Sequence, residues 1–440
     1  MRTGLFIRIC SLLGYIIVSF EFGTNTDLKE VLKDLGDKHS VVNTAEEIDR
    51  LKTEVEIYVD SLETIHANQR ETLKEISSLL QSGSVEDCEI VFSLPRFVHP
   101  KISPNSLDAI DKVFSIGNSR TKIQVVDFLG DRLPAAELVP ILKTALSDID
   151  AEVRLKAIQT CCQRKLEELV PQLEEAFQTG GEFDRFITLD SSEPISLVEQ
   201  ILMECGNNEL SSPLLQKHAK TLIDESGDSN VAMAAKYFLC ETGKEEIAKT
   251  YRRELVETAC NSEDRYQLQA IELCSESQTI PFETQVLIIE KNLQSEKTWV
   301  CDKTISAIVS LSRRYPEHSP TLYRQAIQKA SPERLGPLFH DLDKVQLTPE
   351  LLGDLVLVLA DLNQNVSTYF TARRAIANLL LNPQFDDEKL LEFLRHLKEH
   401  SKSPIVAGEA ESALSFIKSG GRAAIKRMWD LEAEIDKSQG

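Results

Sequence analysis

The 440-residue sequence contains few aromatic residues: they make up 6% of the chain, with only two tryptophans. Leu, Ile, Ala and Glu carry much of the sequence instead. A core built from these residues packs through aliphatic contacts, which favours helices. Apolar residues at 42% and charged residues at 27% give enough apolar surface for a core, so global disorder is excluded.

Long basic runs are also lacking, and the formal charge is −21, from 70 acidic and 49 basic side chains. Nucleic-acid binding depends largely on Lys and Arg side chains that neutralise phosphates. An acidic body repels those phosphates, so no nucleic-acid partner is expected. The nearest approach to a basic patch is Arg422, Lys426 and Arg427, which we interpret as cations near a helix end, beside its dipole.

Compact catalytic motifs are missing as well, including G-x-G-x-x-G, the P-loop, G-x-S-x-G and the EF-hand loop. One five-residue match to the inverted zinc-protease motif H-x-x-E-H occurs at His396, Glu399 and His400, with Glu409 or Glu411 as a candidate third ligand. A match this short arises by chance, and only 40 residues follow it. We therefore reject a metal site and expect a solvated helix face, and we predict no catalytic residue and no cofactor.

Residues 1–22 hold the longest apolar run of the sequence. Arg2 and Arg8 precede an apolar stretch from Ile9 to Phe20, and Glu21 ends it. Its roughly twelve apolar-class positions are too few to cross a bilayer comfortably and match the apolar region of a signal peptide. We expect a signal peptide or short N-terminal anchor here, and an exported protein or one that meets a membrane only through this segment. A wrongly assigned start would instead make the protein cytoplasmic.

Residues 138–177 show the clearest internal organisation: a helix, a short polar turn, a second helix, and the start of the next pair. Val153, Ala157 and Cys161 lie on one helical stripe. With Val153 as the reference, comparable positions recur at a mean period of roughly 35 to 36 residues, which is typical of helical-pair solenoids. The reference positions are Val85, Thr121, Val153, Glu193, Val231, Tyr266, Val300, Thr371 and Val406, with one weak copy near Leu335.

Two columns of residues support this register. Four residues after the reference, small residues dominate; eight residues after it, the residues are aliphatic or cysteine. The first column includes Ala157, Ala235, Ala270, Ala375 and Ala410, and is broken by Glu89 and Thr304, while the second includes Cys161 and Cys274. The cysteines therefore fit buried packing positions better than a disulfide framework or a zinc site, and no C-x-x-C occurs.

The phrase Asp150-Ala-Glu-Val153-Arg154, followed by Ala157, resembles the signature of HEAT repeats, which are armadillo-type helical repeats. In that family the Asp and Arg tend to form a ladder between successive repeats. The resemblance implies an all-α fold: a right-handed α-solenoid of about ten antiparallel helical pairs. Only this repeat carries the signature in full, so armadillo-like and generic helical pairs are alternatives.

The two ends of the array differ from the repeats, which we place at residues 83–419. Residues 23–82 are expected to form N-terminal helices, either a cap on the first repeat or a short coiled coil. The coiled-coil alternative, with a homodimer through residues 44–66, follows from the spacing of Ile48, Leu51, Val55, Tyr58, Leu62 and Ile65. Residues 420–440 are expected to form a C-terminal capping helix and tail, with Trp429 as a closing core aromatic or a partner anchor.

These observations favour a non-catalytic protein-binding scaffold or adaptor that presents an acidic helical-repeat surface. Its partner is expected to be a basic or amphipathic protein, because the excess of carboxylates attracts cations. Two alternatives from other classes are a HEAT-like lyase or other enzyme subunit with a site in the concave face, and an exported armadillo-like co-chaperone. No motif in the sequence supports either alternative directly.

Overall fold

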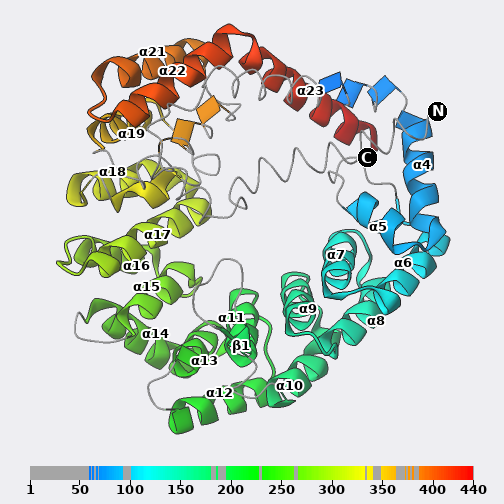
Figure 1. Ribbon diagram of the computed structural model, residues 1–440. Coiled ribbons are helices and arrows are strands. Elements are labelled where there is room, and N and C mark those ends of the chain that lie inside the picture. Colours follow the sequence, from blue (N-terminus) through cyan, green and yellow to red (C-terminus); the bar gives the residue numbers. More distant parts are fainter. Residues whose placement is uncertain are drawn as a thin grey trace, which may run out of the picture. The chain divides into compact units, whose positions relative to one another are not determined.

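The computed structural model describes residues 59–60, 62–63, 66–67, 69–92, 101–179, 185–186, 195–226, 230–261, 266–331, 334–339, 348–362, 372, 375–376, 379–380 and 386–439. These residues are helical apart from loops and one short antiparallel pair of strands, β1 (Arg185–Phe186) and β2 (Ile195–Ser196). The predicted all-α class, built from helical pairs, is confirmed (Figure 1). Within this described part, no helix is both long and apolar enough to span a membrane. Residues 1–22 lie outside it.

The chain divides into two compact units, and the first contains Met1–Val125 together with Leu379–Gly440. Its described helices are α4 (Gln69–Ser82), α5 (Val85–Phe92), α6 (Pro104–Ile116), the first half of α7 (Ser119–Gly130), α21 (Asp387–His400), α22 (Pro404–Lys418) and α23 (Gly421–Gln439). Helix α4 packs on α5 and α6, and α22 packs on both α21 and α23. Gly420, with φ of 93°, occupies the left-handed conformation that separates α22 from α23.

The second unit contains Val126–Asn378. Its described elements after α7 are α8 (Ala135–Leu146), α9 (Ala151–Gln163), η2 (Glu167–Leu169), α10 (Val170–Thr179), the two strands, α11 (Leu197–Asn207), α12 (Pro213–Ser226), α13 (Asn230–Thr242), α14 (Glu245–Cys260), α15 (Gln267–Glu276), α16 (Phe282–Asn292), α17 (Thr298–Arg314), η3 (Pro316–His318), α18 (Ser319–Lys329), η5 (Gly336–Phe339) and α19 (Pro349–Asp361). Each even-numbered helix from α8 to α16 packs on the odd-numbered helix that follows it.

The helices of the second unit form two layers. The odd-numbered layer consists of α9, α11, α13, α15 and α17, each of which packs on the next in the series. The even-numbered layer consists of α8, α10, α12, α14, α16 and α18, and Figure 1 shows α8, α10 and α12 on one side of α9, α11 and α13. This two-layer stacking of helical pairs is the arrangement of an α-solenoid.

Local sequence explains where several helices begin. The Asp150 carboxylate accepts hydrogen bonds from the backbone N–H groups of Glu152 and Val153, and so caps the first turn of α9. Ser103 and Thr348 cap α6 and α19 in the same way, and each is followed by a proline at the first helical position. These caps satisfy donors that would otherwise have no partner at a helix start.

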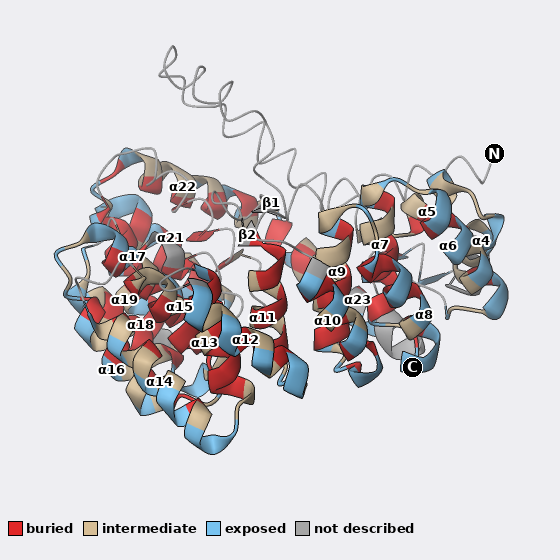
Figure 2. Ribbon diagram, turned by 90° about the horizontal axis from the view of Figure 1, so that it is seen from below, coloured by how far each residue is buried: buried red, intermediate tan, exposed pale blue. Residues whose placement is uncertain are grey.

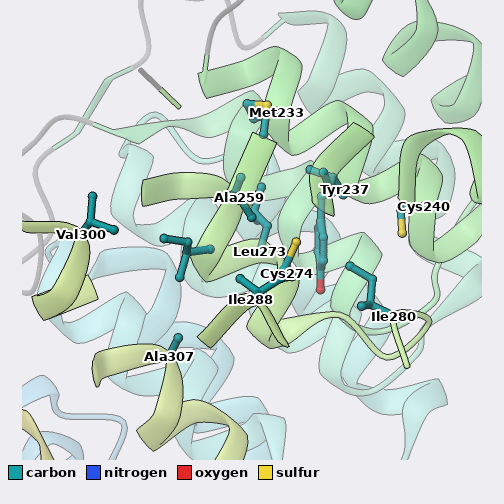
Figure 3. Packing of buried hydrophobic residues seen from close by; sticks show 13 residues of the cluster. Met233, Tyr237, Cys240, Ala259, Leu273, Cys274, Ile280, Ile288, Val300 and Ala307 are labelled. Atoms are coloured by element: carbon teal, nitrogen blue, oxygen red, sulfur yellow. The ribbon is translucent and has the colours of Figure 1, made fainter. Parts of the chain in front are cut away.

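The helices bury the faces that carry the two repeating columns, and Figure 2 shows buried residues gathered on the faces that meet neighbouring helices. Apart from Glu89, the described members of both columns are at most 6% exposed, including Val125, Ala157, Leu197, Ala235, Ala270, Ala375, Ala410, Leu129, Cys161, Ile201, Leu239, Cys274, Ile308, Leu379 and Leu414. In the second unit, one cluster brings together α13, α14, α15, α16 and α17 through side chains that include Tyr237, Leu273 and Ile288 (Figure 3). Aliphatic contacts of this kind are the main source of solenoid stability.

Two residues that break the small-residue column have structural reasons. Glu89 of α5 accepts a hydrogen bond from Thr121 Oγ1 of α7 at 2.5 Å, so the column position carries a polar contact between successive pairs. Thr304 of α17 is fully buried, and its hydroxyl donates to the carbonyl of Val300 at 2.6 Å. Both polar groups are satisfied, which removes the cost of burying them.

Two positions of the predicted repeat register lie beside residues that the structure does not describe. The reference Glu193 lies outside the described residues, and helix α11 begins four residues after it, at Leu197. The strands β1 and β2 stand between α10 and α11 and lengthen this repeat. At the weak copy near Leu335, the described residues form the short 3₁₀ helix η5, which packs on α17.

Candidate interaction surface

A row of polar side chains runs along the odd-numbered layer of the second unit. We call it the polar row and define it as Asp127, Lys156, Glu199, Glu204, Gln269, Glu272, Glu276 and Lys303. Asp127 belongs to the second half of α7, and the others lie on α9, α11, α15 and α17. Each is half-buried or exposed, because the side chains sit beside the buried seam between neighbouring helices.

Ion pairs and hydrogen bonds connect successive helices along this row. Lys156 Nζ of α9 lies 2.5 Å from Asp127 Oδ1, and Lys303 Nζ of α17 lies 2.5 Å from Glu272 Oε2 of α15. The Asp127 and Glu272 side chains are 52% and 42% exposed, so these pairs are accessible to solvent. Such exposed pairs add little stability, and their carboxylates are able to meet a partner.

The polar row has an excess of negative charge. Its five carboxyl groups are Asp127, Glu199, Glu204, Glu272 and Glu276, against the two lysines. Burial raises the pKa of the Glu204 and Glu276 carboxyls and is the largest cause of the shift in both. The pKa of Glu276 is raised to about 7. The row is therefore suited to bind cations, and part of its charge depends on pH near neutrality.

The HEAT-signature residues contribute to a turn. Besides the capping role of Asp150, Arg154 Nη1 donates to the carbonyl oxygens of Asp148 at 2.8 Å and Ile149 at 2.9 Å. Both acceptors belong to the α8–α9 loop, so the Arg holds the turn within its own helical pair. Among the other predicted repeat positions, Val153, Val231, Ala235 and Ala270 are buried against neighbouring helices.

Two other arginines, which the sequence pattern did not single out, connect successive pairs. Arg164, directly after α9, donates to the carbonyls of Gly130 and Leu133, the second at 3.0 Å. Arg314, the last residue of α17, donates to the carbonyls of Ser275 at 2.8 Å and Ser277 at 2.7 Å. In each case the acceptors lie at or just after the end of the preceding odd-numbered helix. These bonds satisfy carbonyls that a helix end leaves unpaired.

The sequence held a partial signal for these arginines. Arg164 stands 11 residues after its reference position, Val153. Arg314 stands 14 residues after its reference, Val300, so the pattern has no constant offset. The shared feature is a basic residue at the end of the second helix of a pair. It can be recognised only once the helix ends are known.

The H-x-x-E-H residues lie on α21, in the first unit. The rings of His396 and His400 have centroids 4.6 Å apart, and Glu399 and His400 are 66% and 60% exposed. Glu411, a candidate third ligand, instead accepts a hydrogen bond from Lys398 Nζ at 2.7 Å. No group of three or more His, Cys, Asp or Glu side chains in the described residues has a metal-binding arrangement.

The basic residues near the C-terminus were interpreted as cations favoured by the dipole at a helix end, but they lie at the start of a helix. Arg422, Lys426 and Arg427 lie in the first two turns of α23, where the helix dipole disfavours cations. Asp387 at the start of α21 compensates, since its carboxylate lies 3.2 Å from Arg422 Nε and 2.8 Å from Lys426 Nζ. Burial of Arg422 is nearly complete, and these three residues form ion-pair contacts in place of a free basic patch.

The start of the described chain contacts α23. Arg427 Nε lies 3.4 Å from Glu63 Oε1, and His66 Nε2 lies 3.8 Å from Glu434 Oε2. Val59 packs against a cluster formed by Phe416 and Ile425, to which the half-buried Trp429 also belongs. The guanidinium of Arg422 lies 5.0 Å from the Trp429 ring centroid. Trp429 therefore has an intramolecular packing role, and the homodimer through residues 44–66 stays a prediction because most of that segment lies outside the described residues.

The described cysteines are reduced and, apart from the half-buried Cys260, buried. Cys162 of α9 and Cys205 of α11 face each other with their sulfur atoms 3.7 Å apart. Burial raises the pKa of Cys88 to about 11 and that of Cys161 to about 12. A protonated, buried thiol is a poor nucleophile and metal ligand, so these side chains act as packing residues.

No protein-family model matches the sequence, and no curated protein matches it. Among known structures, the chain is similar to one described as a homology model of the full-length AP-3 complex in an intermediate open conformation. The similarity covers 86% of this chain and 94% of that chain, at 11% sequence identity and a TM-score of 0.31. A match with this TM-score carries no argument about function.

Proposed function

We propose that the protein is a non-catalytic scaffold that binds a basic or amphipathic protein segment along the polar row. The observation that carries the proposal is the acid excess of this row, in which Asp127 and Glu272 are both accessible to solvent. A helix-lined surface with repeated carboxylates offers several contacts to a partner with evenly spaced cations. Association is then steered by charge and weakened by salt.

We further infer that the helical pairs are HEAT-like. The support is the Asp150 cap and the Arg154 contacts with the α8–α9 loop, which give the signature residues a role in holding one helical pair together. The arginine contacts from Arg164 and Arg314 to the preceding pair add a second recurring interaction. The roles of residues 1–22 in export and of residues 44–66 in dimerisation are part of the same proposal and rest on the sequence alone.

The proposal is tested with three synthetic helical peptides of equal length, one basic, one neutral and one acidic, by fluorescence anisotropy with the full chain. We expect the basic peptide to bind at low salt and to lose most of its affinity at high salt. The triple variant Asp127→Asn, Glu199→Gln, Glu272→Gln is expected to bind it at least about fivefold more weakly, because three charges of the polar row are removed.

The matched control is the triple variant Glu245→Gln, Glu257→Gln, Glu283→Gln, which also removes three carboxylates, all of them exposed, from the even-numbered helices α14 and α16. It is expected to bind the basic peptide within about twofold of the unchanged chain. Equal loss in both triple variants would mean that only the total charge matters. Tight binding of the acidic peptide would refute the proposed partner class.

A further inference from the structure

Cys162 of α9 and Cys205 of α11 bring two sulfur atoms together inside the second unit. The Sγ atoms lie 3.7 Å apart, and both side chains are fully buried. Helices α9 and α11 belong to successive helical pairs and pack directly on each other (Figure 1). The stacking of the repeats therefore holds the two thiols within reach of one another.

Three other buried cysteines make contacts that stay within one stretch of chain. Cys88, Cys161 and Cys301 each donate to a backbone carbonyl 5 to 8 residues away, at 3.7 to 3.8 Å. Cys161 directly precedes Cys162, but successive side chains of an α-helix point about 100° apart, so the two face different directions. A contact between sulfur atoms of different helical pairs distinguishes Cys162 and Cys205 from these three.

The two cysteines are also far apart in the sequence. They are separated by 43 positions, and η2, α10, β1 and β2 stand between α9 and α11. A cross-link that closes a loop of this length removes much of the freedom of the unfolded chain. It also holds two successive helices of the odd-numbered layer together by a covalent bond.

We propose that Cys162 and Cys205 form a disulfide bond that fastens α9 to α11 when the chain meets a small disulfide oxidant such as oxidised glutathione. The sulfur atoms of a disulfide lie about 2.05 Å apart, so the two must approach by about 1.7 Å. Rotation of the two side chains about their Cα–Cβ bonds supplies a movement of this order. In the reduced chain both sulfur atoms are packing atoms. The cross-link is a property of the chain itself and needs no binding partner.

The reaction is thiol–disulfide exchange. One cysteine loses its proton, and its sulfur attacks a sulfur of oxidised glutathione, which breaks the glutathione S–S bond and releases one glutathione thiolate. The second cysteine then loses its proton and attacks the protein sulfur of this mixed disulfide, which releases the second glutathione. The two protons pass to the two released thiolates. Two cysteine thiols are thus oxidised, and one oxidised glutathione is reduced to two glutathione molecules.

The folded environment makes this exchange slow. The hydrogen bond with Cys205 raises the pKa of Cys162, and burial raises it further. The thiolate is the form that attacks a disulfide, and an oxidant cannot reach a sulfur that is fully buried. The cross-link therefore forms while the chain folds, or during local opening of α9 from α11.

Mapping of linked peptides after refolding tests the cross-link. The reduced full chain is unfolded in urea, refolded with reduced and oxidised glutathione, alkylated and digested with trypsin without reductant. We expect mass spectrometry to find residues 157–164 linked to residues 186–217, and dithiothreitol to remove this species. The folded chain in the same buffer is expected to form it at least about tenfold more slowly.

The neighbouring cysteine provides a matched control. Residues 157–164 contain both Cys161 and Cys162, each fully buried, so alanine removes the same buried group at either position. Cys161→Ala is expected to keep the link to Cys205, whereas Cys162→Ala is expected to lose it. Circular dichroism checks that both variants fold. Fragmentation of the linked peptide between its two cysteines identifies the bonded sulfur in the unchanged chain as well, so the assignment does not depend on the variants.

A stability measurement shows whether the bond fastens the two helices. The oxidised chain is expected to have a Tm at least about 4 °C higher than the chain kept in dithiothreitol, because the cross-link closes a long loop. In Cys162→Ala, the two conditions are expected to give the same Tm. A refolded chain without the linked peptide overturns the proposal, and so does a link made through Cys161. A linked chain whose Tm is unchanged or lower also overturns it.

Discussion

At the scale of single residues, the arginines that bond to carbonyl groups of the preceding pair stabilise the stacking of repeats. Arg314 donates to two carbonyls at the end of α15, and its guanidinium lies 5.0 Å from the Tyr315 ring centroid. Truncation leaves both carbonyls without this charged donor. We expect Arg314→Ala to destabilise the second unit by about 2 to 4 kcal/mol, visible as a lower urea midpoint.

The control for this prediction is Arg253→Ala on α14. The Arg253 side chain is 71% exposed and its ion pair with Glu257 is 3.8 Å long, so its loss is expected to change stability by less than about 0.5 kcal/mol. A shift of equal size in both variants would show that Arg314 acts through net charge alone.

The buried thiols give a second prediction at this scale. Because burial raises the pKa of Cys88 to about 11 and that of Cys161 to about 12, both stay protonated at neutral pH. In a Cys10→Ser chain, we expect Ellman's reagent to modify at most the half-buried Cys260 quickly, and all cysteines after urea is added. Above pH about 9 the unfolded thiols ionise while the folded ones do not, so stability falls as pH rises there. Rapid native modification of several thiols would contradict the packing role.

At the scale of elements, α13 is the most tightly enclosed helix of the odd-numbered layer. Ala235 is fully buried, and a Cβ added at Gly206 of α11 would lie 3.0 Å from the Tyr237 ring, so there is no spare space on this side. We expect Ala235→Leu to destabilise the second unit by about 1 to 3 kcal/mol in urea unfolding. The matched change Ala136→Leu, on an exposed face of α8, is expected to be nearly neutral.

The register of these elements was predictable where a helix keeps its repeat length. Ala157 and Cys161, four and eight residues after Val153, are buried as the column pattern indicates. The strands β1 and β2 before α11 were not predictable, because two-residue strands have no recognisable period. The hydrogen bond from Gln269 of α15 to Glu199 of α11 was not predictable either, since residues two repeats apart meet only once α13 is packed.

At the scale of the whole molecule, the net negative charge follows from the composition, and the structure locates part of this charge in the polar row. The composition indicates an acidic protein, but only the stacking of α9, α11, α15 and α17 places Lys156, Glu204, Glu276 and Lys303 in one row. In the 440-residue sequence the charged residues show no spacing pattern that predicts this row, because its members come from different helices. Binding residues of this kind have no local motif, which is why the sequence suggested a partner class and no site.

The net charge of −21 predicts two opposite responses to salt. Self-repulsion among carboxylates destabilises the folded chain, so raising NaCl from about 10 to about 150 mM is expected to raise Tm by a few degrees through screening. The same addition weakens binding of the basic peptide. In the polar-row triple variant the net charge is −21 + 3 = −18, so both responses are expected to be smaller. Differential scanning fluorimetry and anisotropy on the same samples measure both effects. A Tm that falls with salt would mean that ion pairs such as Lys156–Asp127 outweigh the repulsion.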